Sequence, residues 1–148
     1  MTPLILVLLA LSPQAKLSPP VTIYVTAPEI EADRAHGLIT AKVPPDVEQA
    51  RSQISHHAGG VGRELDLAAT PTDAAVTLLC EGLSSRTVAG AFGGSLTEWT
   101  VTATLIVGDY RRPFRASAGD SRLAITQLLK DVIAFLRANR QILTLTNR

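Results

Sequence analysis

The chain has 148 residues, the length of one ordinary domain. Hydrophobic residues make up 46% of it and charged residues 18%, which supplies enough apolar material for a core and excludes a disordered chain. A net charge of +1 argues against binding polyanions through bulk charge. The single cysteine excludes an internal disulfide framework and a cysteine-rich zinc module.

Residues 4–11 form an apolar run, LILVLLAL, that is too short to span a bilayer, which takes about 20 residues. Its length fits the hydrophobic segment of a secretory signal peptide with cleavage after Ala15. Residues 1–15 are therefore predicted to be a signal peptide, and the protein to be exported to the periplasm or the medium. A buried first strand is the alternative, because no basic residue precedes the run. No cysteine follows the run, so a lipid-anchored form is not expected.

The first half of the mature chain contains one clear strand and one helix. Residues 16–20 contain two prolines and are predicted to be an extended lead-in. Residues 21–27 alternate apolar and polar side chains, which predicts a half-buried strand. Residues 28–43 have no clear period and are expected to form a loop, with a short strand over 37–43. Residues 44–58 begin with prolines and an acid and carry apolar side chains at helical spacing, which predicts a helix.

The middle of the chain contains two further predicted strands. A short strand is expected over residues 63–69, and the continuous apolar run 75–83 predicts a central strand. Cys80 lies in that run and is expected to be a small core side chain. Residues 84–96 are rich in Gly and Ser and are expected to form a hairpin connection that is long enough to be mobile.

A hairpin and a helix complete the chain. Residues 98–107 alternate strictly, Gly108 and Asp109 can form a two-residue turn, and residues 110–117 return as an edge strand because Pro113 lacks a ladder donor. A helix capped by Asp120 or Ser121 follows, with an apolar stripe that ends at Leu143.

The element order β-α-β-β-β-β-α predicts an α+β fold. Both helices need an apolar partner, and the alternating strands offer one buried face each. We therefore expect a two-layer sandwich in which a mostly antiparallel sheet of four to five strands carries two helices on one face. Residues 21–143 form the single domain, followed by a tail over residues 144–148.

Chemistry-bearing motifs are sparse. His56 and His57 are adjacent on a helix, so their side chains diverge, whereas paired metal ligands are normally three or four residues apart. A small hydrolase or metal-dependent enzyme that uses this pair remains the alternative function. The run Gly59–Gly62 follows a helix, whereas a phosphate-binding loop precedes one. No catalytic residue, metal ligand or cofactor is predicted.

The most informative feature is charge segregation. Residues 1–110 hold six basic and eleven acidic side chains, whereas residues 111–148 hold eight basic and two acidic ones. Part of this excess lies on the predicted edge strand, where charges also deter edge-to-edge aggregation. The functional interpretation is an anion-binding face. Its candidate binding residues are Tyr110, Arg111, Arg112 and Arg115.

These observations favour an exported interaction module that uses the basic edge strand and the C-terminal helix. Its partner would be a protein strand added at the edge or an anionic component of the cell envelope. A nucleic-acid binder is the third hypothesis, and the near-neutral total charge and scarce aromatic residues argue against it.

Overall fold

The structure is a computed structural model that describes residues 16–37, 43–57 and 64–147. The predicted signal peptide, most of the strand expected over residues 37–43, and the glycine run Gly59–Gly62 lie outside the described residues.

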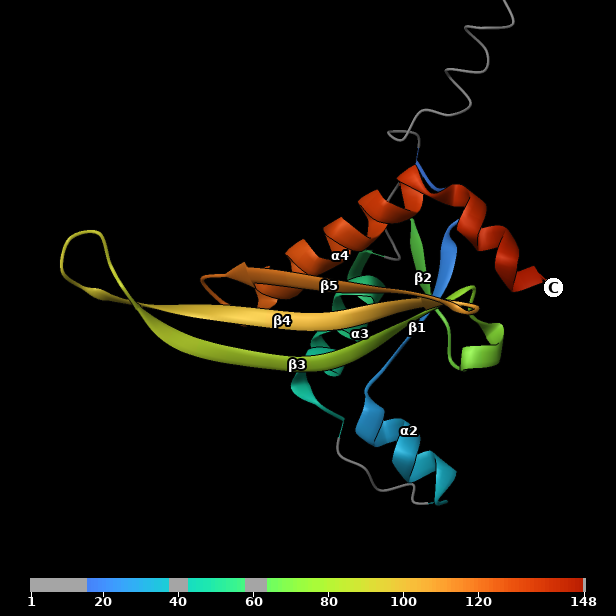
Figure 1. Cartoon of the computed structure of the whole chain (residues 1–148), viewed down its shortest axis with the longest axis horizontal. Helices are drawn as coiled ribbons and strands as arrows, with labels where there is room; N and C mark the ends of the chain where they lie inside the picture. Colours follow the sequence, from blue (N-terminus) through green and yellow to red (C-terminus); the bar gives the residue numbers. More distant parts are fainter. Residues whose placement is uncertain (1–15, 38–42, 58–63, 148) are drawn as a thin grey trace, which may run out of the picture.

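The described chain forms a five-stranded sheet in the order β2-β1-β3-β4-β5, accompanied by three α-helices (Figure 1). The strands are β1 (Val21–Thr26), β2 (Leu65–Leu67), β3 (Val76–Ala89), β4 (Ser95–Val107) and β5 (Tyr110–Ala118). The helices are α2 (Pro28–Ala35), α3 (Pro45–His57) and α4 (Ser121–Ala138), and two 3₁₀ segments are η1 (Pro71–Asp73) and η2 (Arg140–Asn147). The predicted α+β sandwich is confirmed.

The sheet has a mixed and an antiparallel part. β1 is parallel to both of its neighbours, β2 and β3. The chain crosses over from β1 to β2 through α2 and α3, as a parallel pair requires. β3, β4 and β5 form an antiparallel meander. The β4–β5 turn is the predicted one, with Gly108 at φ 59°, a value that favours glycine. β5 lies at the edge, as its Pro113 predicts.

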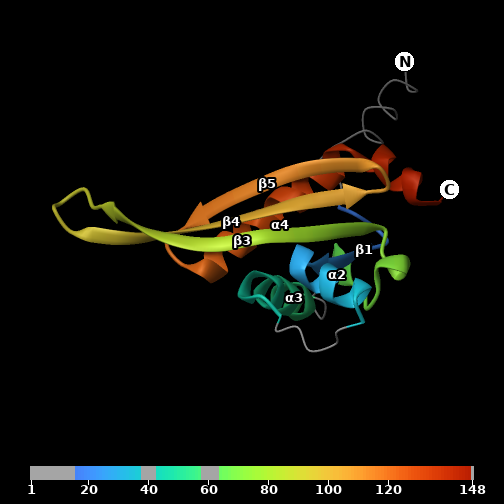
Figure 2. The ribbon, with the colours of Figure 1, turned by 60° about the horizontal axis from the view of Figure 1, so that its bottom comes forward.

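One layer of the sandwich is formed by α3 and α4, which lie on the same side of the sheet (Figure 2). α4 packs mainly on β4 and β5, and α3 packs on β1, β2 and β3. The buried side chains of α4 recur every three or four residues, as the apolar stripe predicts: Ala124, Ile125, Leu128, Leu129, Val132, Phe135 and Leu136. They meet the alternate residues of β4, namely Val101, Ala103, Leu105 and Val107. Within the described chain, no helix is long and apolar enough to cross a membrane.

The loop expected over residues 28–43 contains a helix, so that expectation is wrong for α2. Pro28 occupies the first helical turn, and Glu29 and Glu31 lie near the positive helix end. Only Ile30 of this helix is buried, so the sequence has no apolar period that would predict the helix. Arg34 lies 5.4 Å from the ring centroid of Tyr24, which holds α2 against the end of β1.

Residues 84–96 belong to a hairpin, as predicted, but most of them are strand rather than a long connection. β3 continues through Ala89 and pairs with β4 from Ser95, which leaves a turn of only five residues. The final helix is also shorter than its stripe predicts. α4 ends at Ala138, and Leu143 lies in η2, partly buried against the core.

Candidate functional site

The four predicted binding residues all lie on β5, but on two different faces. Tyr110 and Arg112 pair with Val107 and Leu105 of β4 and therefore point toward the helix layer. Arg111 and Arg115 pair with Ile106 and Thr102 and point to the face that α3 and α4 leave uncovered. The three arginines are exposed, and Tyr110 is 39% exposed.

On the helix side, Arg112 lies against an aromatic cluster that joins β5 to α4. Tyr110 stacks on Phe135 with the ring centroids 6.0 Å apart, and Phe114 meets the same ring edge-on at 5.7 Å. The Arg112 guanidinium lies 4.5 Å from the centroid of Phe135 and 5.2 Å from that of Phe114. This stacking holds the cation in a defined position and leaves its N–H groups free to bind an anion.

A shallow hollow of about 580 Å³ opens beside this cluster, between β5 and the last two turns of α4. It is lined by Arg112, Pro113, Phe114, Arg115, Asp131, Ala134, Phe135, Ala138 and Asn139. Asp131 accepts a hydrogen bond from Gln127 at 2.9 Å. The hollow therefore combines the Arg112 guanidinium, an aromatic wall and one acid, with Arg115 at its rim on the edge strand.

The outer edge of β5 carries main-chain groups that no described strand pairs with. Val107 and Tyr110 close a two-residue hairpin, so hydrogen-bonded pairs alternate from there along the ladder. Arg111, Pro113 and Arg115 consequently turn their main-chain groups outward. Pro113 has no N–H, so the edge offers the N–H groups of Arg111 and Arg115, and the carbonyls of all three residues.

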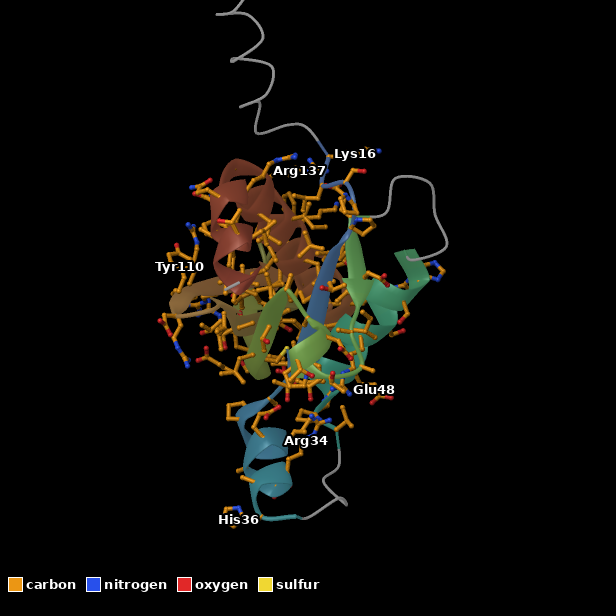
Figure 3. All side chains as sticks on the ribbon, turned by 90° about the vertical axis from the view of Figure 1, so that its right-hand side faces the viewer. Lys16, Arg34, His36, Glu48, Tyr110 and Arg137 are labelled. Atoms are coloured by element: carbon orange, nitrogen blue, oxygen red, sulfur yellow. The ribbon has the colours of Figure 1, made fainter. Side chains whose placement is uncertain are left out.

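The rest of the basic C-terminal third does not extend this surface uniformly. Arg137 donates two hydrogen bonds to the carboxylate of Glu64, one of them from Nε at 2.7 Å. This pairing lowers the pKa of Glu64 below its ordinary value, and burial of the carboxyl opposes the shift. Figure 3 shows Arg137 beside Lys16, whereas Tyr110 lies on another flank of the molecule. Part of the charge excess therefore serves a structural ion pair, and only three of the eight basic residues lie on β5.

The residues of the alternative enzyme hypothesis lie apart from β5. His56 lines a hollow of about 900 Å³ between α3 and the start of α4, together with Asp120 and Thr126. The side chain of His57 lies outside the described residues. His36 ends α2, where its ring bonds the Ala32 carbonyl at 2.7 Å (Figure 3). Within the described ranges, no group of three His, Cys, Asp or Glu residues could hold a metal ion.

Cys80 is a core side chain, as predicted, with 2% of its surface exposed. It borders a hollow of about 460 Å³ beneath the first turns of α2 and α3, near the buried carboxylate of Asp46. Burial, followed by the negative charge of Asp46, raises the pKa of the Cys80 thiol to about 12. A thiol in this state is a poor nucleophile.

Sequence reasoning missed the main contact of Arg112. Phe135 belongs to the apolar stripe of α4, and its ring also holds both Tyr110 and Arg112. The signal for this contact is the position of Phe135 at the border of the stripe, beside the exposed residue Ala134.

Comparison with known proteins gives only distant likenesses. No family model and no curated protein matches the sequence. Among solved structures, the chain is similar to a minor lipoprotein from Acinetobacter baumannii, with 14% identity, a TM-score of 0.44, and coverage of 80% of this chain and 94% of that one. It is also similar to a ribosomal subunit interface protein from Coxiella burnetii, with 9% identity, a TM-score of 0.36, and coverage of 81% and 98%. At these scores the likenesses carry no argument about function.

Proposed function

We propose that this protein is an exported interaction module that binds an extended, acidic segment of a partner protein along the free edge of β5. The observation that supports it is the combination of unpaired main-chain groups and arginine side chains on one edge strand. An added strand would bond the outward N–H and carbonyl groups of Arg111 and Arg115. The arginines flank that strand on both faces of the sheet and favour acidic side chains in it.

The proposal distinguishes the charge of Arg115 from its main-chain N–H. Arg115→Ala removes the charge and keeps the N–H. Arg115→Pro removes both, and it breaks no bond to β4 because this N–H points outward. The loss of one main-chain hydrogen bond corresponds to about 0.5–1.5 kcal/mol, so Arg115→Pro should bind about 2- to 12-fold more weakly than Arg115→Ala.

The probe is a synthetic strand-forming peptide of alternating valine and glutamate, with its valine–lysine counterpart as the control ligand. Titration should show binding of the acidic peptide that weakens with added salt, and further weakening in the Arg111→Ala and Arg112→Ala variants. Lys130→Ala, at an exposed position on α4, is the matched control and should bind as the unchanged protein does. Equal binding of both peptides, or equal affinity of the two Arg115 variants, would contradict strand addition at this edge.

Export is tested separately, by the N-terminal sequence and intact mass of the chain made in a Gram-negative host. A species that begins at Lys16 in the periplasm or medium is expected. A soluble cytoplasmic chain that begins at Met1 would remove the export part of the proposal and leave the peptide result unaffected.

A further inference from the structure

The far end of the β3–β4 hairpin is a second exposed surface, separate from β5. β1 pairs with β3 only as far as Leu79, and β5 pairs with β4 only from Trp99 onward. From the Arg86–Glu98 pair to the turn, β3 and β4 pair with each other alone. We call residues 84–98 the arm, and Figures 1 and 2 show that it projects well beyond the sandwich.

The turn at the end of the arm presents a phenylalanine to solvent. Gly93 N–H donates to the Gly90 carbonyl at 3.3 Å, and Gly93 has φ 85°, which favours glycine. Phe92 lies in the centre of this turn and is fully exposed at 103%. Leu96, one strand position beyond the turn, is 62% exposed. Two of the largest exposed apolar side chains of the described chain therefore share one tip.

The tip is also free of charge. Residues 87–97 contain no charged side chain, and the ion pair between Arg86 and Glu98, at 2.9 Å, marks the boundary on both strands. Charge-free runs of similar length over residues 17–28 and 99–108 contain β1, which is almost wholly buried, and most of β4, in which every second side chain is buried. In the arm, by contrast, the uncharged stretch over residues 87–97 is mostly exposed to solvent.

We infer that this tip inserts Phe92 and Leu96 into the interfacial region of a lipid bilayer. A phenylalanine buries about 150–250 Å². Even with the partly exposed Leu96 added, the tip supplies well under the roughly 800 Å² that each partner contributes to a standard protein interface. A bilayer requires no complementary pocket, and an uncharged tip enters it without the cost of transferring a charge. The projection of the arm lets the tip reach a flat surface before the rest of the molecule does.

Insertion is shallow for a physical reason. The arm is a ribbon of only two strands, so its outer edges carry unpaired main-chain groups that hydrocarbon cannot satisfy. The tip therefore reaches the boundary between headgroups and acyl chains, at a depth of about 5–10 Å. Because the tip is neutral, its affinity should be nearly the same for zwitterionic and anionic lipids, and insensitive to salt.

The test is co-sedimentation of the full chain with phosphatidylcholine vesicles, alone and mixed with phosphatidylglycerol, at low and high salt. Phe92→Asp and Leu96→Asp should each lower the partition coefficient at least about tenfold, since each removes one buried apolar side chain. Leu123→Asp is the matched control. It alters another exposed leucine, 55% exposed, in the first turn of α4, and should bind as the unchanged protein does.

A second measurement locates the tip in the bilayer. Phe92→Trp in a Trp99→Phe background should give a tryptophan emission that shifts to the blue with vesicles and is quenched by lipids brominated near the headgroup. Circular dichroism of each variant verifies that it is folded.

Three results would overturn the inference. The first is equal vesicle binding by Phe92→Asp and the unchanged chain, which would assign any binding to other segments such as the apolar residues 4–11. The second is binding only to anionic vesicles and its loss in high salt, which would assign it to basic side chains. The third is no vesicle binding together with a dimer that Phe92→Asp converts to a monomer, which would make a second copy the occupant of the tip. Arg115→Pro should retain vesicle binding, so failure at the β5 edge and failure at the tip are distinguishable.

Discussion

Arg137 in the last turn of α4 holds the carboxylate of Glu64, the residue just before β2, through two hydrogen bonds. The same carboxylate accepts the main-chain N–H of Leu17 at 3.1 Å. Because 9% of the Glu64 side chain and 28% of the Arg137 side chain are exposed, the pair is largely shielded from water. One ion pair thus ties the end of the long helix to the start of β2 and to the N-terminal lead-in.

Arg137→Ala should destabilise the protein by about 1–3 kcal/mol, because it leaves a shielded carboxylate with only one of its partners. The stability of Arg137→Lys should lie between that of Arg137→Ala and that of the unchanged protein, since an ammonium keeps the charge but cannot bond both oxygens in parallel. Urea unfolding at neutral pH measures both values. Equal stability of Arg137→Ala and the unchanged protein would show that this pair contributes nothing.

The pair also predicts a dependence of stability on pH. The folded-state pKa of Glu64 lies below its ordinary value of 4.5. The folded state therefore binds this proton less readily than the unfolded state does, so the contribution of Glu64 is fully present above that ordinary value. It is lost as the pH falls through the folded-state pKa. Glu64→Gln should lose less stability than the unchanged protein over this acidic range, and parallel curves would contradict the prediction.

Asp120 caps α4, since its Oδ1 accepts the N–H of Leu123 at 2.8 Å. Asp120→Ala should cost about 1 kcal/mol and lower Tm by about 2–4 °C. Asp131→Ala, in the middle of the same helix, is the comparison and should change Tm less. Calorimetry of the two variants decides the point.

The arm predicts a local effect of glycine substitutions. Gly93→Ala places a side chain at φ 85°, and in Gly90→Ala the new Cβ would lie 2.8 Å from the Gly94 carbonyl oxygen. Both should speed amide hydrogen exchange over residues 84–98 and leave the exchange of α4 unchanged. Gly94→Ala meets nothing within 4 Å and serves as the control. Uniform exchange in all three variants would mean that the turn does not need these glycines.

The Cys80 thiol should be unreactive in the folded state. With a pKa of about 12 and 2% exposure, the thiol should react with an aromatic disulfide reagent only as fast as the protein opens. The reaction rate at mildly alkaline pH, with and without urea, measures this. Rapid labelling of the folded chain would contradict it, as would a disulfide between two folded copies.

Elements with a strong period were predictable, and elements specified by few contacts were not. The alternation in β4 and the stripe of α4 each arise from many buried residues, so the sequence predicts both elements and the sandwich they form. α2 buries one side chain, Ile30, and no period marks it. Residues 84–89 of β3 and 95–97 of β4 were missed because they face solvent, so small and polar side chains dominate them and no apolar pattern indicates pairing.

The candidate site shows the same division. The period of two predicts that Arg111 and Arg115 share a face apart from Arg112, and the register confirms it. The stacking of Arg112 on Phe135 depends on how α4 lies across β5, a tertiary relationship that neither segment specifies alone. The pairing of Arg137 with Glu64 joins residues 73 positions apart and is equally invisible in the local sequence.

The position of β1 between β2 and β3 has a consequence for the order in which the chain can fold. The first strand of the described chain lies between β2 and β3, and Thr22 accepts the N–H of Ala75, 53 residues later. β3, β4, β5 and α4, by contrast, are joined by short connections and can associate by local contacts. Folding models based on sequence separation therefore place β1, together with its edge neighbour β2, last in the sheet. During synthesis or transport from the N-terminus, β1 stays unpaired until the chain beyond residue 79 has emerged. Its apolar side chains are exposed during that time and can be bound by chaperones.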